Sequence, residues 1–266
     1  LTWEAIAESC LSKCENKELL LDLCKKYIPS MKQFLEVDAK LALEASSNVV
    51  VSSTFKLLFC FKSLLRRPQE ITSNEDNDEQ KFVDPLNDIL YYSLFSDYKD
   101  KDIPYYYSSQ DRLPIAIEMT FIFCLIWSFG AIITEDCRVT FNNFLREKML
   151  DLKSVCPFPS DKTVFNYFID FSSLKWTEWC DGKNNLEFTL EQPIENQMIP
   201  TNESASVIYL ARLLCEHDRS VIIQGPQTSK TLITNTLINT ILDPNIFDCH
   251  FYPLANCSIP ANIGSF

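Results

Sequence analysis

The sequence predicts an α+β chain: a mainly α-helical domain with a small β-hairpin, followed by the start of an α/β phosphate-loop domain. Three observations support this. Apolar residues recur at helical spacing through most of the first 150 residues. Aromatic residues then alternate over 164–181, as in a short antiparallel strand pair. Residues 204–241 read as helix, apolar strand, turn and helix, the order in which an α/β domain opens.

The helical domain is predicted to begin with helices within residues 1–65. Apolar side chains three and four residues apart continue from Trp3 to Leu35, and another helix runs from about Asn48 through Leu65. The strongest helical signal is Leu113–Met149, which we expect to form a long hydrophobic helix, a break near Gly130 and a second helix. Trp127, in the hydrophobic helix, is predicted to be a core residue.

One apolar stretch, Ile115–Ile133, has the length of a membrane span. Glu118 lies inside it and its flanks are not strongly basic, so we expect a helix buried in a bundle and no membrane partner. The acidic stretch Glu70–Gln80 and the tyrosine-rich Ile103–Asp111 are predicted to be connections.

Charge and cysteine content exclude some functions. The net charge of −12 argues against a nucleic-acid-binding surface. Eleven cysteines without a C-x-x-C pair, and only two histidines, predict reduced, buried thiols in a cytoplasmic compartment rather than a zinc site. The chain begins at Leu1 without an initiator methionine and stops at Phe266, so we expect an excised piece of a longer protein.

After the helical domain the period of the pattern changes. Val164–Asp170 and Trp176–Cys180 are predicted to form the hairpin. The second domain is then expected to consist of alternating helices and parallel strands. Its predicted elements are a helix at Ser204–Cys215, a strand at Arg219–Gln224, a helix at Thr231–Ile241 and a strand at Ile246–Phe251.

The turn between the first strand and the second helix of this domain resembles a phosphate-binding loop. Residues 220–231 read SVIIQGPQTSKT, close to the Walker A pattern G-x-x-x-x-G-K-[ST]. The stretch from Gly225 to Lys230 is one residue too short, and Ser229 stands where the second glycine belongs. Lys230 and Thr231 still suit a phosphate contact and a Mg²⁺ ligand, so ATP with Mg²⁺ is the cofactor that the pattern implies.

The shortened loop is expected to bind ATP weakly or not at all. The loop holds phosphate through successive backbone N–H groups and needs its full length and a residue that accepts positive φ. Two lost charge-assisted hydrogen bonds weaken affinity by roughly two to four decades. After Thr231 no apolar run ends in Asp-Glu, so no catalytic residue is assigned and hydrolysis by this chain alone is not expected.

Several sequence motifs, in the same order along the chain, resemble those of one protein family. Residues 121–149, FIFCLIWSFGAIITEDCRVTFNNFLREKM, resemble the lid segment of the dynein heavy chain family. VFNYFID with WTEWCD (164–170 and 176–181) resembles the hairpin that follows, and residues 198–226 resemble the entry to an AAA+ module. The opening LTWEAIAESCL is similar to the family's L-x-W-x-x-x-x-x-S-W-L, with Cys10 in place of tryptophan.

The resemblance implies that residues 1–185 are the lid of the second AAA+ module, with its hairpin at about 164–181. Residues 186–266 would then be the start of the third module, cut before Walker B. It further implies a divergent axonemal dynein heavy chain, a microtubule-motor ATPase of the cytoskeleton and cilium axoneme with a coiled-coil stalk. Other AAA+ modules of the same chain, microtubules, and dynein intermediate and light chains are its implied partners.

Two further questions stay open from the sequence. In a working module Pro200 and Thr201 would border the adenine, whereas Thr201 also suits a helix cap over Ser204. Arg138 and Arg146 could face a neighbouring module, although exposed helix arginines are more often solvated or weakly paired. The alternative to a structural and regulatory motor segment is a fragment of a non-motor AAA+ or P-loop ATPase with a helical sensor domain.

Overall fold

The computed structural model describes residues 2–12, 14, 16–61, 113–171, 173–180, 201–224, 227–238, 242 and 247–248. Of residues 227–229 only the backbone is described. Four predictions therefore fall outside the described residues. They are the two connections at Glu70–Gln80 and Ile103–Asp111, the contacts of Pro200 and Gly225, and most of the strand expected at Ile246–Phe251.

Three helices open the chain. They are α1 (Trp3–Leu11), α2 (Lys17–Val37) and α3 (Ser47–Cys60). Thr2 caps α1, because its side-chain oxygen accepts a hydrogen bond from the backbone N–H of Ala5. These three helices were expected from their apolar spacing, and each directs buried side chains into one common core.

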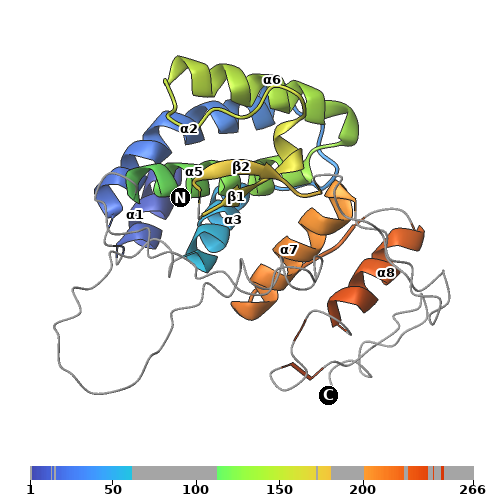
Figure 1. Ribbon diagram of the computed structural model, residues 1–266. Helices are drawn as coiled ribbons and strands as arrows, with labels where there is room; N and C mark the ends of the chain where they lie inside the picture. The colour runs from blue at the N-terminus through green and yellow to red at the C-terminus, as the bar shows by residue number, and fades with distance from the viewer. Residues whose placement is uncertain are drawn as a thin grey trace, which may run out of the picture.

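The central element is α5 (Leu113–Phe129), which the other helices of this domain surround (Figure 1). Within the described residues, Leu113–Ile132 is the one stretch long and apolar enough to cross a bilayer, and 72% of its apolar window is buried in the protein. Its burial on nearly every side explains why it lacks a polar face. The sequence prediction of a buried bundle helix agrees with this packing.

The predicted break at Gly130 is present. A 3₁₀ turn (η2, Gly130–Ile132) follows α5, and α6 (Glu135–Asp151) begins after it. This turn is held from outside by the link between α2 and α3, since Leu41 pairs with Ile133 in an isolated antiparallel bridge.

The hairpin is shorter than predicted. A 3₁₀ turn (η3, Val164–Asn166) takes the first three residues of the expected strand, and the strands are β1 (Tyr167–Asp170) and β2 (Lys175–Glu178). They are antiparallel, with Ile169 opposite Trp176. The inward-facing Tyr167, Ile169 and Trp176 join the core of the helices. We call the part from α1 to β2 the helical domain.

Two helices of the second domain are described, α7 (Asn202–Glu216) and α8 (Gln227–Thr236). The strand predicted at Arg219–Gln224 is wrong for this structure, because these residues pair with no other described segment and Ile222 is 86% exposed. A strand gains its hydrogen bonds only from a neighbouring strand. The described fold is thus mostly helical with a two-stranded antiparallel sheet, as the predicted fold class requires.

The described cysteines are free thiols, and five of them are buried. Burial raises the pKa of Cys24 to about 12 and that of Cys60 to about 11. Thiols of this kind behave as small apolar core residues. This agrees with the expectation of reduced, buried cysteines.

Candidate functional site

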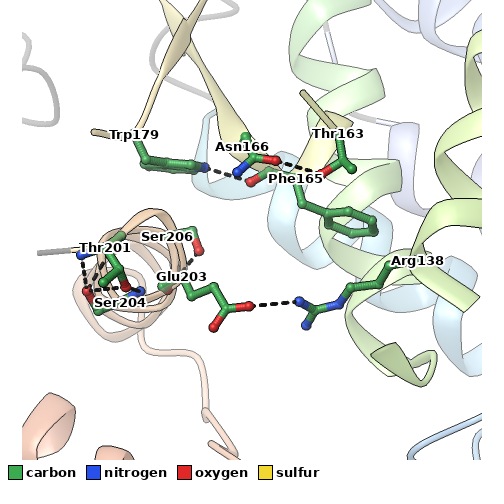
Figure 2. Close-up of polar contacts among 9 residues, drawn as sticks. All are labelled: Arg138, Thr163, Phe165, Asn166, Trp179, Thr201, Glu203, Ser204 and Ser206. Carbon is green, nitrogen blue, oxygen red and sulfur yellow. Dashed lines mark hydrogen bonds and ion pairs between the residues drawn. The ribbon is translucent and has the colours of Figure 1, made fainter. Parts of the chain in front are cut away.

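The N-terminus of α7 is the first element that the sequence placed near a nucleotide. The hydroxyl groups of Thr201 and Ser204 there form hydrogen bonds that cap the helix. Thr201 Oγ1 accepts a hydrogen bond from the Ser204 N–H at 3.1 Å, and Ser204 Oγ accepts one from the Thr201 N–H at 2.8 Å (Figure 2). This is a capping box. Thr201 is therefore placed to begin the helix, while Pro200 beside it lies outside the described residues.

Helix α7 has two apolar faces that belong to two different cores. Ala205, Tyr209 and Leu213, four residues apart, join the large core of the helical domain. Ile208 and Ala211, on another face, join a second small core with Leu237 and Leu242. Residues four apart share one face of a helix, so this split follows from the sequence pattern. One helix is thus shared between the helical domain and the second domain.

Ring contacts hold α7 on the hairpin side of the helical domain. The Tyr209 ring lies edge-on to Trp179, with ring centroids 5.2 Å apart, and edge-on to Phe123 at 6.1 Å. Beside it, the Cys180 N–H donates to Asn202 Oδ1 at 2.9 Å. Trp179, at the end of the hairpin, and Phe123 of α5 therefore form the surface on which Tyr209 docks, a contact that the sequence did not indicate.

We call the contact between α7 and the helical domain the junction. An ion pair also crosses it, from Arg138 on α6 to Glu203 on α7 at 3.4 Å (Figure 2). Its side chains are 39% and 78% exposed, and exposed pairs contribute about 0.2–1 kcal/mol. Burying a side chain such as Leu213 contributes about 1.5–3 kcal/mol. The apolar contacts of α7 therefore hold the junction, and the ion pair adds orientation.

Phe165 of η3 contacts both α5 and α6 near the point where α7 docks. Its ring lies against the guanidinium of Arg138, 5.4 Å from the ring centroid, and against Trp127, whose ring centroid is 5.9 Å away. Trp127 is partly rather than fully buried, so its prediction as a core residue is corrected. It packs edge-on to Phe165 because it lies on the face of α5 that meets the junction rather than on the face inside the bundle.

Gly130 leaves the space that the Phe165 ring occupies. A Cβ atom at residue 130 would lie 2.6 Å from Phe165 Cε1 and 3.3 Å from Phe141 Cε1. Contacts below 3 Å force a neighbour to move, so the glycine at the helix break is required by packing. The sequence indicated a break here but not its partner.

Arg146 is half-buried and hydrogen-bonded within its own domain, so it is not the solvated or weakly paired side chain that the sequence favoured, whereas a contact with a neighbouring module stays a prediction. Its guanidinium donates to the backbone carbonyl oxygens of Phe158, Pro159 and Lys162, at 3.3, 2.7 and 2.6 Å. Its Nε donates to Asn142 Oδ1 at 3.1 Å. Arginine carries five donors in a fixed plane, which suits such a set of carbonyls. Arg146 thereby fixes the loop that leads from α6 to the hairpin.

The phosphate-loop residues lie mostly inside a helix. The predicted helix was to begin at Thr231, but α8 begins at Gln227, so Ser229 and Lys230 belong to its first turns. Thr234 Oγ1 donates to the Lys230 carbonyl oxygen at 2.8 Å, a contact within the helix. Pro226 directly precedes the helix, and proline is well tolerated at helix starts.

Ser229, Lys230 and Thr231 of the Walker-like pattern lie in the first turns of α8, and the N-terminus of a helix is a place where phosphate can bind. In an α-helix only the first four N–H groups lack a partner, so the N–H of Thr231 is taken by the helix itself. Lys230 is half-buried and the Thr231 side chain is exposed. Gly225, which opens the turn, lies outside the described residues. How the residues named for phosphate and Mg²⁺ are arranged around one centre stays a prediction, because Gly225 and the side chain of Ser229 lie outside the described residues.

Comparison with known proteins gives two family matches. Residues 88–181 match the dynein heavy chain AAA lid domain, and residues 186–263 match the P-loop containing dynein motor region. The boundary between the two matches falls shortly after β2, which ends at Glu178, and before α7, which begins at Asn202. The chain thus divides where the structure passes from the helical domain to the second domain.

Curated relatives agree with these matches. The chain is similar to dynein axonemal heavy chain 9 of Homo sapiens, 30% identical over 132 residues, covering 49% of this chain and 3% of the relative. It is 33% identical over 109 residues to the ciliary dynein beta chain of Tripneustes gratilla, covering 41% and 2%. It is 28% identical over 158 residues to dynein axonemal heavy chain 1 of Mus musculus, covering 53% and 4%. The chain thus spans only a few percent of the length of these relatives.

Proposed function

Because the chain belongs to the dynein heavy chain family and spans a lid and the next AAA module, we propose that it is a structural and regulatory segment of an ATP-driven microtubule motor. Its relatives are axonemal and ciliary dyneins, and its location is the cytoskeleton of the cilium axoneme. The alternative of a non-motor ATPase with a helical sensor domain is left without support by these matches.

The proposed boundaries keep those expected from the sequence. Residues 1–185 form the lid of the second AAA+ module and residues 186–266 the start of the third. The family matches at 88–181 and 186–263 support this division. In this position the segment works with the other AAA+ modules of its own chain. Microtubules and the dynein intermediate and light chains are contacted by other parts of the parent protein.

The observation that carries the proposal is the sharing of α7 between two cores. A rotation of the lid displaces Tyr209 and Leu213, and with them Ile208 and Ala211 in the core of the next module. Packed interfaces of this kind move as rigid bodies rather than deform continuously. The segment therefore transmits motion from one module to the next through α7.

The phosphate loop supports a role that does not depend on nucleotide here. Dynein motor modules of this family use nucleotide and Mg²⁺ in general. In this chain Lys230 lies inside α8 and the loop before it is one residue short. We infer that the third module stays empty or holds ATP only weakly, and acts as a fixed spacer.

Two measurements test the two parts separately. The first is a Mg²⁺–ATP titration of a chain that carries the complete third module, with the first module's site inactivated. We expect no binding at low micromolar ATP, and no difference between Lys230→Ala and the exposed control Lys25→Ala. Tight Mg²⁺-dependent binding that Lys230→Ala alone abolishes would show that the loop works.

The second measurement is microtubule gliding by the parent motor with Tyr209→Ala, compared with Tyr209→Phe, which keeps the ring. We expect Tyr209→Ala to slow gliding while the ATPase of the first module continues, because the lid no longer moves α7. Equal gliding by both variants would contradict transmission through α7.

A further inference from the structure

A groove of about 280 Å³ runs between α2 and α6. Its floor is the stacked pair Phe34 and Phe144, whose ring centroids are 4.7 Å apart at an angle of 23°. Phe34 is buried, whereas Phe144 is half-buried and reaches the groove. In Figure 1 α2 and α6 lie together at the top of the molecule, away from α7 and α8. The groove is therefore not occupied by the junction with the next module.

The rim of the groove is acidic. Three exposed carboxylates, Asp38, Glu147 and Asp151, line it, with Lys148 as its one cationic side chain. In the part of the chain that the structure describes, none of these carboxylates forms an ion pair. The excess of negative charge on the rim is thus left without an internal counter-charge.

Two of the three carboxylates lie at helix ends. Asp38 is the C-cap of α2, which has no basic residue in its last turn, and Asp151 ends α6. A helix C-terminus carries a partial negative charge, which favours cations and disfavours carboxylates. The Lys40 N–H donates to Cys137 Sγ at the start of α6, so the two helices are antiparallel. The two negative ends therefore lie at opposite ends of the groove, with the Phe144 ring between them.

We propose that this groove docks a basic, amphipathic segment of a partner protein. Such a segment has a lysine or arginine for each acidic end and an apolar side chain for Phe144. A second copy of this chain is disfavoured, because the chain carries a net charge of −12 and like charges would face each other. The acidic stretch Glu70–Gln80 of the chain itself is excluded as the occupant by the same argument.

The affinity of the groove depends on charge and therefore on salt. Exposed pairs are screened at physiological ionic strength, where the Debye length is about 8 Å. Several such pairs around one apolar contact nevertheless act together in one interface. We expect binding that weakens as salt rises but does not vanish, because the contact with Phe144 is apolar.

The test is fluorescence anisotropy of the 266-residue chain with a labelled helical peptide that carries two lysines at each end and a central leucine. The test variant removes the three rim charges: Asp38→Asn, Glu147→Gln and Asp151→Asn together. The matched control removes three exposed charges elsewhere on the helical domain: Glu4→Gln, Glu8→Gln and Glu18→Gln. Circular dichroism checks that both variants keep the helix content of the parent chain.

We expect the rim variant to bind the peptide at least tenfold more weakly and the control variant to bind within twofold of the parent. Phe144→Ala should weaken binding at high salt more than at low salt. Equal loss in the rim and control variants would mean unspecific attraction to an acidic protein, and it would overturn the proposal. A chain that forms dimers, which the rim variant abolishes, would overturn it in favour of self-association.

Discussion

The helical domain and the second domain differ in how their backbone N–H and C=O groups are hydrogen-bonded and in how many of their described side chains are buried. Helix α5 is buried nearly all round, between the other helices of its domain and the hairpin. Among the residues that the structure describes, the second core has Ile208, Ala211, Leu237 and Leu242 as its buried members. Residues 219–224, described between α7 and α8, form no strand, and Ile222 is largely exposed. Helices pair their own N–H and C=O groups, whereas a strand depends on a neighbour.

This difference shows where the stability of the chain lies. The helical domain is stabilised by its own core, and α7 is fixed because it shares that core. Helix α8 is held through the few residues of the second core. Substitutions in the two regions should therefore have different effects on the free energy of unfolding.

The largest effect is expected from truncation in the core of the helical domain. Phe121→Ala removes a fully buried ring and should lower the free energy of unfolding by about 3–5 kcal/mol. Leu237→Ala, in the second core, should lower the free energy of global unfolding by less than about 1 kcal/mol, because α8 opens locally first. Denaturant unfolding followed by circular dichroism measures both. Equal losses would show that the two regions form one cooperative unit.

A smaller effect is expected from overpacking at the helix break. Gly130→Ala places a methyl group against Phe165 and should cost about 1–3 kcal/mol. Adding Phe165→Leu should recover part of this loss, since the smaller side chain makes room. A double variant that is less stable than the sum of the two single changes would contradict the contact.

The sequence showed the helical domain well because its signal is local. Apolar spacing located α2, α3, α5 and the break before α6, and each of these elements satisfies its hydrogen bonds within itself. The strand at Arg219–Gln224 was predicted from its apolar run and from its place before the Walker-like turn, and neither reveals whether a pairing partner is present. The first residues of β1 were likewise taken by the η3 turn.

The candidate site was less predictable, because it depends on residues far apart in the sequence. The cap at Thr201 could be read from its spacing to Ser204. The contacts of Tyr209 with Trp179, and of Arg146 with the carbonyl oxygens of 158–162, join segments that no local pattern relates. A signal for α7 was present in the spacing of Ala205, Tyr209 and Leu213, which marks a second apolar face.

Alkaline pH should weaken the helical domain. Burial raises the pKa of Tyr27 to about 12, with the charge of Glu118 adding to this effect. Burial also raises the pKa of Tyr167 to about 12, together with the hydrogen bond that its hydroxyl donates to Asp161. The ordinary value is 10.0, so these groups contribute stability that is present below pH 10 and lost as pH rises through 12.

Unfolding in denaturant at pH 8, 10 and 11.5 checks this expectation. The decrease between pH 10 and 11.5 should be smaller in the double variant Tyr27→Phe and Tyr167→Phe, which has no phenol to ionise at these positions. An identical decrease in the double variant would assign the alkaline loss to other groups.

The central claim is that α7 belongs to the core of the helical domain, although its sequence belongs to the next module. Native-state hydrogen exchange of the 266-residue chain tests it most directly, since protection reports the free energy of opening for each helix. The account predicts that the α7 amides which follow the cap, around Tyr209 and Leu213, exchange with the same opening free energy as those of α5. It further predicts that α8 amides exchange much faster. Exchange of α7 together with α8, at an opening free energy well below that of α5, would contradict the claim.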